Sequence, residues 1–390
     1  MTLISRKPAV PFRHQLMLAL LAGILLGPAG ARAEGDSFLK KIKPHPHLGF
    51  AVRYDDNVFL DPTGKTNDVS FLISPGLQLL YGDEERNFAA LDYTLGIERF
   101  VDLDDQNAIN HLLKFDTHVE AGHIILDLSH VFQDISGANV DVGSRVEEQR
   151  NITRAEAEYR ISEKTGVGLN YRQEFHDYDA TNLTDSALFE VGGSFFYRIQ
   201  PKTDLLVQLN QGWIDEDSTG ADSDYQEVNL GVRGQITSKI DGTAKVGYRH
   251  HNFTAAGSDD ADMVTAGITL EGKFTERTSA ELEVTRTISP SASAAGNSYE
   301  VTHVGLILRQ RVGSKFTLIA RGGYEHDDYD VLIFGVDRSD DYWELGCGVE
   351  YEATKWFRAG VHYRYAQNES TTPAVEFEQN VVIFEALFHY

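Results

Sequence analysis

The feature that most restricts the fold of this 390-residue chain is a two-residue alternation of apolar and polar side chains in many separate stretches of 10 to 17 residues. In "FRAGVHYRY", Phe357, Val361 and Tyr363 occupy one set of alternate positions, and Arg358 and Arg364 occupy the other. Successive side chains of a β-strand point to opposite faces. Each stretch therefore predicts a strand with one apolar and one polar face.

The connectors between these stretches alternate in length. Eight are short, such as "SEKT" and "TERT", nine are long, polar and variable, such as "DEDSTGADSD", and the two kinds take strict turns between 18 strands. Short turns at one end, long loops at the other and an apolar outer face are typical of outer-membrane barrels. A spanning sheet must close, because lipid cannot satisfy an unpaired backbone edge.

We therefore predict an all-β fold, a transmembrane antiparallel up-and-down β-barrel of about 18 strands with short periplasmic turns and long extracellular loops. A soluble sandwich would rarely need strands this long. A β-propeller would show a longer, blade-sized repeat, and the sequence has none.

The first residues have the pattern of an export signal. Arg6, Lys7 and Arg13 precede the apolar run 16–30, and "ARA" follows at 31–33. This predicts a cleaved signal peptide over 1–33, because the run is shorter than the ~20 residues that a membrane anchor needs. We expect a periplasmic N-terminal segment over 34–46 and the barrel over 47–390.

The last residues predict the strand that seals the barrel. Alternate positions, including Phe384, Phe388 and Tyr390, are apolar and would face lipid, with the aromatic side chain of Tyr390 in the interfacial belt. The pattern resembles the C-terminal recognition signal of bacterial outer-membrane barrels, so we predict an assembly signal at these three residues. The alternative is an ordinary edge strand.

Composition limits the partners. The net charge of −24 disfavours nucleic acid, and the lone Cys347 excludes an internal disulfide framework. We expect contact with outer-membrane lipid and lipopolysaccharide, and with the barrel-insertion machinery.

The polar face carries many charges, which cannot face lipid because an arginine at the bilayer midplane costs about 2–4 kcal/mol. Eighteen strands leave room for an aqueous channel. This wall would either orient an anionic or sugar solute or neutralise itself within a hydrated lumen. The residues predicted to line the pore are Arg53, Asp55, Arg154, Arg172, Arg198, Arg233, Arg249, Arg309, Arg311, Arg321, Glu344, Glu350, Arg358 and Arg364.

The third long connector, Asp134–Asn151, admits two interpretations. In general porins the third outer loop folds into the pore and narrows it. The alternative is a loop that stays at the surface.

We expect no catalytic residue, no cofactor and no metal site. The chain lacks a G-x-S-x-G nucleophile elbow. The pairs His45/His47 and His250/His251 have no further His or Cys at a zinc-ligand spacing.

The segments "VRYDDNVF" (Val52–Phe59) and "SPGL" (Ser74–Leu77) resemble the putative β-barrel porin 2 family. The resemblance implies a channel, polysaccharide export as its context, and periplasmic polysaccharide-export components as partners. The alternatives are a structural or adhesive barrel that acts through its acidic loops, and an outer-membrane enzyme.

Overall fold

The computed structural model describes residues 41–217, 222–254, 260–293, 298–329 and 338–390. The chain divides into two compact units, Met1–Ile42 and Lys43–Tyr390. The predicted signal peptide and most of the predicted segment 34–46 lie outside the described residues, so both stay predictions. No helix in the described part is long and apolar enough to cross a membrane.

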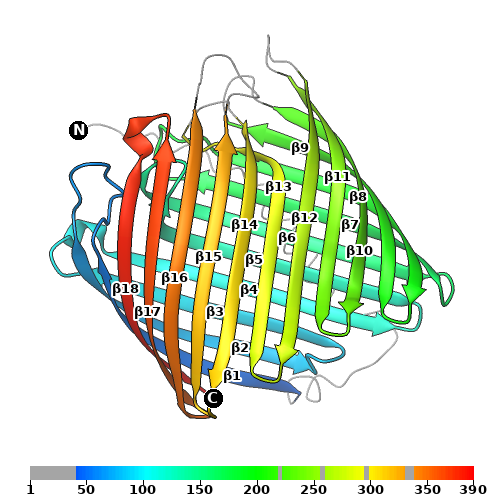
Figure 1. Ribbon diagram of the computed structural model, residues 1–390, viewed down its shortest axis with the longest axis horizontal. Helices are drawn as coiled ribbons and strands as arrows, with labels where there is room; N and C mark the ends of the chain where they lie inside the picture. Colours follow the sequence, from blue (N-terminus) through cyan, green and yellow to red (C-terminus); the bar gives the residue numbers. More distant parts are fainter. Residues whose placement is uncertain (1–40, 218–221, 255–259, 294–297, 330–337) are drawn as a thin grey trace. The chain divides into compact units, whose positions relative to one another are not determined.

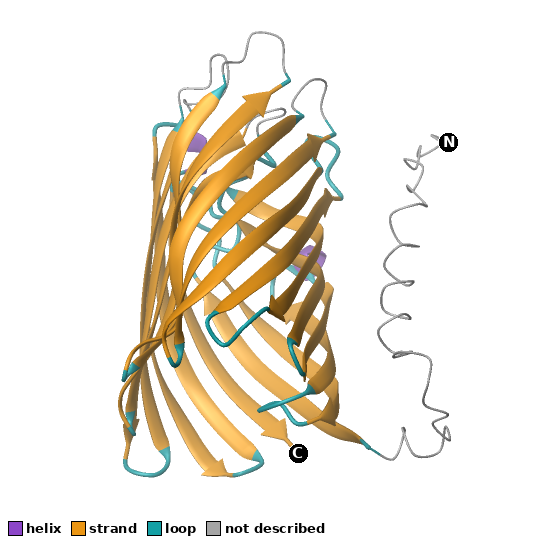
Figure 2. Ribbon diagram, turned by 90° about the vertical axis from the view of Figure 1, so that its right-hand side faces the viewer, coloured by secondary structure: helices purple, strands orange, loops and turns teal. Residues whose placement is uncertain are grey.

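The second unit is a closed antiparallel barrel of 18 strands in which neighbours in sequence are neighbours in space (Figures 1 and 2). The predicted fold class is confirmed, and the short and long connectors alternate as expected except between β5 and β6, where only residues 140–143 connect the strands. The strands are β1 (Ile42–Asp55), β2 (Asp68–Gly82), β3 (Phe88–Phe100), β4 (Ala108–Ala121), β5 (Ile124–Asn139), β6 (Ser144–Arg160), β7 (Thr165–Tyr178), β8 (Ser186–Gln200), β9 (Thr203–Glu216), β10 (Ser223–Thr237), β11 (Ile240–Phe253), β12 (Ala261–Thr275), β13 (Thr278–Pro290), β14 (Ser298–Val312), β15 (Phe316–Asp328), β16 (Ser339–Thr354), β17 (Phe357–Ser370) and β18 (Phe377–His389).

The last strand closes the barrel against the first. β1 and β18 pair from His47↔His389 to Asp55↔Val381, and β1 also pairs with β2. Phe388 lies opposite Leu48, and its ring meets the Phe50 ring edge-on at 6.3 Å. Because the sheet closes, no strand of the barrel presents an unpaired backbone edge to lipid, which cannot hydrogen-bond to it.

One predicted boundary is wrong. β1 begins at Ile42 and not at His47, so part of the segment predicted as periplasmic is strand. Pro44 and Pro46 lie in this stretch, and proline donates no backbone hydrogen bond. Proline is tolerated at the start of a strand, and the Pro46 carbonyl still accepts a hydrogen bond from the backbone N–H of Tyr390 at 3.2 Å.

The outer face of the barrel is apolar. On β17, Val361 and Tyr363 are 45% and 41% exposed, and they lie directly opposite Phe384 and Val382 of β18. Phe384 is itself 55% exposed. A band of exposed aliphatic and aromatic side chains suits lipid and not water.

Candidate functional site

The charged residues that we predicted to line the pore lie on the inner face. Residues directly opposite each other in an antiparallel ladder share a face. Arg364 lies opposite Gly346, which lies opposite Arg321, whereas Cys347 and Tyr363 belong to the exposed apolar set. The same ladders place the whole set on this face: Arg53, Asp55, Arg154, Arg172, Arg198, Arg233, Arg249, Arg309, Arg311, Arg321, Glu344, Glu350, Arg358 and Arg364. That they control permeation stays a prediction.

Most of these arginines have a carboxylate partner. Arg364 Nη1 lies 3.3 Å from Glu344 Oε2, and Arg358 Nη1 lies 3.3 Å from Glu350 Oε2. Arg321 is the exception, since it has no ion-pair partner among the described residues. The pairs favour mutual neutralisation over a uniformly basic wall.

Part of the wall is acidic. A pocket of about 320 Å³ on the inner side of β12 to β16 is lined by Glu271, Glu281, Glu283 and Glu344, with Arg321 among them. Arg309 pairs with Glu281. Glu344 pairs with Arg364, whereas Glu271 and Glu283 have no ion-pair partner among the described residues and add negative charge to this side of the lumen.

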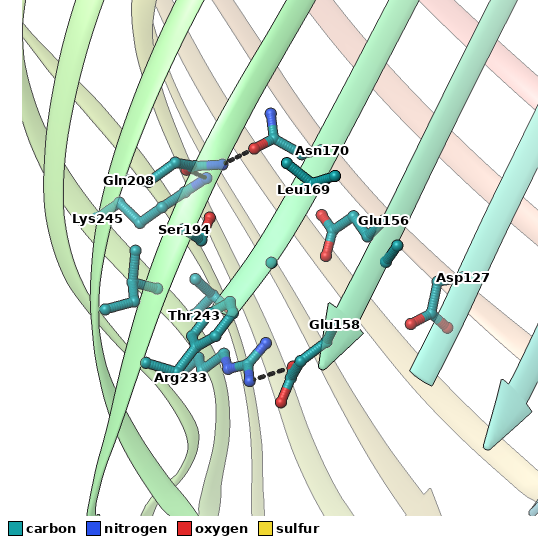
Figure 3. Close-up of a pocket in the computed structure, with 14 residues that line it drawn as sticks. Asp127, Glu156, Glu158, Leu169, Asn170, Ser194, Gln208, Arg233, Thr243 and Lys245 are labelled. Atoms are coloured by element: carbon teal, nitrogen blue, oxygen red, sulfur yellow. Dashed lines mark hydrogen bonds and ion pairs between the residues drawn. The ribbon is translucent and has the colours of Figure 1, made fainter. Parts of the chain in front are cut away.

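A second hollow lies on the inner side of β5 to β11 (Figure 3). It holds a network of amides and charges in a volume of about 110 Å³. Gln208 Nε2 donates to Asn170 Oδ1 at 2.9 Å, and Lys245 Nζ donates to Gln208 Oε1 at 3.1 Å. Arg233 Nη2 donates a hydrogen bond to Glu158 Oε2 at 2.5 Å. These groups present donors and acceptors to a polar solute in the lumen.

The hairpin of β5 and β6 extends beyond its neighbours. β4 stops pairing with β5 at Asp134, and β7 stops pairing with β6 at Glu148, but β5 and β6 pair with each other as far as Asn139↔Ser144. The tip, residues 140–143, turns at Gly143, whose φ of 67° favours glycine. A Cβ there would also lie 2.9 Å from a methyl group of Val375.

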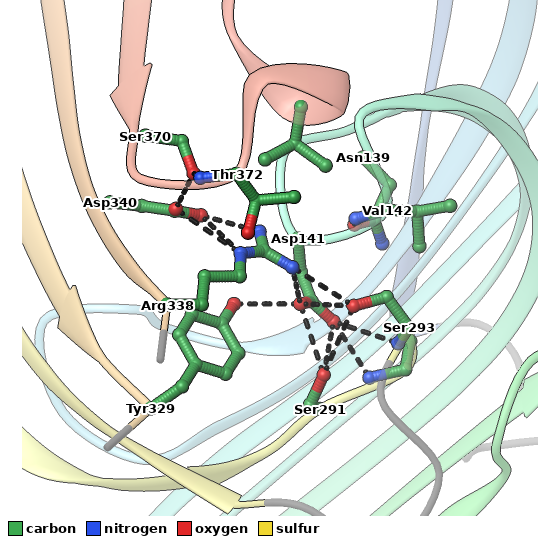
Figure 4. Close-up of polar contacts among 12 residues, drawn as sticks. Asn139, Asp141, Val142, Ser291, Ser293, Tyr329, Arg338, Asp340, Ser370 and Thr372 are labelled. Atoms are coloured by element: carbon green, nitrogen blue, oxygen red, sulfur yellow. Dashed lines mark hydrogen bonds and ion pairs between the residues drawn. The ribbon is translucent and has the colours of Figure 1, made fainter. Parts of the chain in front are cut away.

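The tip is fixed to loops of the other side of the barrel by Asp141 (Figure 4). Its carboxylate accepts hydrogen bonds from Ser291 Oγ at 3.0 Å, from Ser293 Oγ at 2.9 Å and from Tyr329 OH at 2.7 Å. Arg338 donates to it at 3.5 Å. These partners belong to the β13–β14 and β15–β16 connectors, so the hairpin is tied across the mouth of the lumen.

The charges of this cluster are maintained by their surroundings. Burial raises the pKa of Tyr329 far above its usual value, so its hydroxyl stays a donor to Asp141. Burial lowers the pKa of Arg338, but the hydrogen bonds to Asp340 together with the negative charges of Asp340 and Asp141 outweigh this and leave the pKa raised. The guanidinium therefore stays charged.

A second anchor lies at the base of the tip. Arg145 Nη2 is 3.8 Å from Glu98 Oε2, and Glu98 also pairs with Arg53. The Arg145 guanidinium lies 5.2 Å from the centre of the Phe100 ring. Glu98 is 2% exposed, so it is a buried carboxylate shared by two arginines.

The apolar part of the tip is also packed. Val140 contacts a buried cluster of Leu60, Ala366 and Phe377, which comes from the β1–β2 connector, β17 and β18. The tip is thus held by polar contacts on one side and apolar contacts on the other.

The tip of the third connector folds against loops on the opposite side of the barrel, which favours the first interpretation. That it narrows the pore stays a prediction. The predicted bounds Asp134–Asn151 are wrong, because all but residues 140–143 are strand. Beyond Asp134 and Glu148 the hairpin leaves the wall, so it shows no lipid-facing alternation by which to recognise it.

Sequence reasoning missed the anchors of this hairpin. Ser291, Ser293, Tyr329 and Arg338 lie in long polar connectors that have no periodicity. Asp141 was one of many loop aspartates. A tyrosine or an arginine in such a loop gives no local signal of a hydrogen-bond partner that lies far away in the chain.

The comparisons with known proteins concern the family and the fold. The family model for putative beta-barrel porin 2 matches residues 185–389, which include β8 to β18. The segments that carried the resemblance, Val52–Phe59 and Ser74–Leu77, lie outside this match. No curated protein matches the chain.

Several solved outer-membrane proteins are similar to the chain over most of its length. OpdO of Pseudomonas aeruginosa is 14% identical, with 90% of this chain and 97% of that chain covered and a TM-score of 0.49. OpdK of the same organism is 10% identical (89% and 99% covered, TM-score 0.46). OccAB3 of Acinetobacter baumannii is 12% identical (89% and 100% covered, TM-score 0.45).

Proposed function

Because the chain belongs to the putative beta-barrel porin 2 family, it is an outer-membrane channel protein, and we propose that it passes small hydrophilic solutes through a lumen narrowed by the β5–β6 hairpin. The inner wall is charged and amide-rich, which suits water and polar solutes. The outer wall is apolar, which suits lipid.

The observation that carries this proposal is the attachment of the hairpin tip to the far side of the mouth. Asp141 accepts hydrogen bonds from two different connectors, and Arg145 pairs with Glu98 beneath it. Each anchor is buried, so breaking either leaves unpaired charge and costs about 3–5 kcal/mol. A hairpin held in this way limits the size of a solute and does not swing freely.

The charge of the wall gives the channel its preference. Most inner arginines are paired, whereas Glu271 and Glu283 have no cationic partner among the described ion pairs. Charged side chains that line a pore set its ion selectivity. We therefore expect a preference for cations and for neutral polar solutes.

Export of a polysaccharide polymer through the same barrel requires a conformational change that passage of a small solute does not. A polymer would need the hairpin tip to be displaced, and periplasmic export components are the partners that would do this. Passage of small solutes needs no such partner.

The test is solute flux through the purified protein. The wild type, in liposomes, should admit small sugars and exclude larger oligosaccharides. In the comparison variant, residues 137–146 are replaced by Asn-Gly, which joins the directly paired Ser136 and Glu147 by a two-residue turn. This variant should admit larger sugars. Absence of flux from both proteins would overturn the channel, and equal size limits would overturn the constriction.

A further inference from the structure

Three potential metal ligands converge on the inner face near the short turn between β16 and β17. Glu350 on β16, His362 on β17 and Glu385 on β18 each offer one ligand atom, and these atoms lie within 4.8 Å of one another. All three side chains are partly exposed, so an ion in the lumen can reach them. Reading the sequence did not reveal this group, because its members come from three strands.

The ladder explains why they meet. Gly360 on β17 lies directly opposite Glu350 of β16 and directly opposite Glu385 of β18. His362 is two residues further along β17, so its side chain is on the same face. The three ligands therefore surround Gly360.

Glycine at this position leaves the space that the ligands share. A Cβ on Gly360 would lie 2.8 Å from His362 Nε2 and 3.1 Å from Glu385 Oε1. A Cβ on Gly348, opposite His362, would lie 2.3 Å from Nδ1 of the imidazole. The two glycines let the imidazole lie along the wall, with Nε2 3.3 Å from Glu385 Oε1.

We propose that Glu350, His362 and Glu385 bind a divalent transition metal ion, with Zn²⁺ as the reference case. Imidazole nitrogen and carboxylate oxygen are ligands of Zn²⁺, at bond lengths of roughly 2.0–2.2 Å. Ligand atoms around a tetrahedral ion are then roughly 3.4 Å apart. His362 Nε2 and Glu385 Oε1 already have nearly this spacing, at 3.3 Å, and the ligand atom of Glu350 lies within 4.8 Å of both partners. Water from the lumen completes the coordination.

Arg358 opposes this ion. Its Nη1 lies 3.3 Å from Glu350 Oε2, so a bound metal must share or displace this contact. A guanidinium beside the site also repels a dication. The site therefore binds metal less tightly than its three ligands would alone, and removal of Arg358 should strengthen it.

Binding can be measured without any transport assay. Isothermal titration of the detergent-folded barrel with Zn²⁺ should show one site per chain. Gly360→Ala keeps all three ligands but fills the space between them, and it should weaken this site at least tenfold, as should His362→Ala. Arg358→Ala should tighten it.

The matched control is His303→Ala. His303 also lies on the inner face and pairs with a glutamate, Glu325, at 3.1 Å, but it belongs to no group of three ligands among the described residues. This variant should bind Zn²⁺ as the wild type does. Equal binding by wild type, Gly360→Ala and His362→Ala would overturn the proposal, and so would no binding by the wild type.

A second measurement rests on the proposed function. If the lumen conducts, Zn²⁺ should reduce the current of wild-type channels in planar bilayers and should affect His362→Ala channels much less. The two proposals can fail separately. A barrel that binds Zn²⁺ at this site but never conducts refutes the channel and keeps the site, whereas a conducting barrel whose Zn²⁺ block survives in His362→Ala refutes the site.

Discussion

Arg338 Nη1 lies 3.5 Å from Asp141 Oδ1, although the two residues are 197 positions apart in the chain. Both are largely buried, with side chains 6% and 11% exposed. Asp141 is at the tip of the β5–β6 hairpin, and Arg338 precedes β16. This contact ties one wall of the barrel to the opposite wall.

The first prediction concerns that tie. Asp141→Ala removes the acceptor of several buried donors and leaves Asp340 as the one carboxylate that pairs with Arg338 among the described residues, a change of about 3–5 kcal/mol. Each 1.4 kcal/mol is about a factor of ten, so the tip should shift strongly toward a released state. We expect larger single-channel conductance or more frequent transitions between levels in planar bilayers.

The control for this experiment is Asp105→Ala. Asp105 is an exposed aspartate in the β3–β4 connector and lies outside the Asp141 cluster. The conductance of the Asp105→Ala channel should equal that of the wild type. The constriction would be refuted if Asp141→Ala and Asp105→Ala gave the same traces.

The second prediction concerns the buried carboxylate Glu98. Glu98→Gln leaves Arg53 and Arg145 without their shared counter-charge, which should destabilise the barrel by about 3–5 kcal/mol. The folded form should convert to the unfolded form at a lower temperature, as measured by heat-dependent migration in SDS gels. Glu85→Gln, in the exposed β2–β3 turn, should leave that temperature unchanged. Equal temperatures for the two variants would contradict the role of Glu98.

The periodicity of the sequence was sufficient to predict the walls of the barrel and insufficient to predict what lies within them. Alternation arises because one face of each strand meets lipid, so it reveals strands, faces and connectors, including the inward position of Arg321. The hairpin tip meets neither lipid nor a continuous wall. Its partners, such as Tyr329, are selected by hydrogen bonds between distant loops, and no local pattern encodes them.

The metal ligands illustrate the same limit. Glu350 was predicted to face the lumen, which is where it lies. That His362 and Glu385 lie beside Glu350 can be predicted only once the register across β16, β17 and β18 is known, because a slip of one residue would turn each side chain to the other face.

The third prediction concerns selectivity. Arg321 has no ion-pair partner among the described residues, so Arg321→Glu changes the local charge by two units without breaking a pair. The reversal potential in a salt gradient should shift toward that of a more cation-selective pore. The shift should diminish in concentrated salt, since screening acts over about 10 Å at 0.1 M. The control Arg277→Glu, in the exposed β12–β13 turn, should shift the reversal potential far less. If Arg321→Glu left the reversal potential unchanged, Arg321 would not be part of the wall that sets selectivity.

The fourth prediction concerns assembly. Phe388 lies at the end of the sealing strand, and Tyr390 follows the strand directly. The Phe388 ring packs on the Phe50 ring and, at 4.8 Å between ring centres, on the Phe357 ring. Replacing both with aspartate removes apolar contact from the seam and places charge against lipid. We expect loss of the protein from the outer-membrane fraction and its proteolysis in the periplasm. Replacing Glu376 and Glu378 with glutamine, in and beside the last connector, should leave its level unchanged. Equal levels in both double variants would refute an assembly role for the terminal residues.

The fifth prediction tests the register of the outer face. Cys347 is exposed between Leu345 and Val349 on β16, and it lies opposite Ala320 and Tyr363, both on the lipid-facing side. In the membrane-inserted barrel, a bulky water-soluble maleimide should therefore fail to label it, whereas a lipid-soluble maleimide should react. In a Cys347→Ser background, Ser129→Cys places a thiol on the inner face, opposite Asp116 and Arg154. This thiol should show the reverse preference. Rapid labelling of Cys347 by the water-soluble reagent would mean that β16 is shifted by one residue, which would turn Glu344 and Glu350 toward lipid.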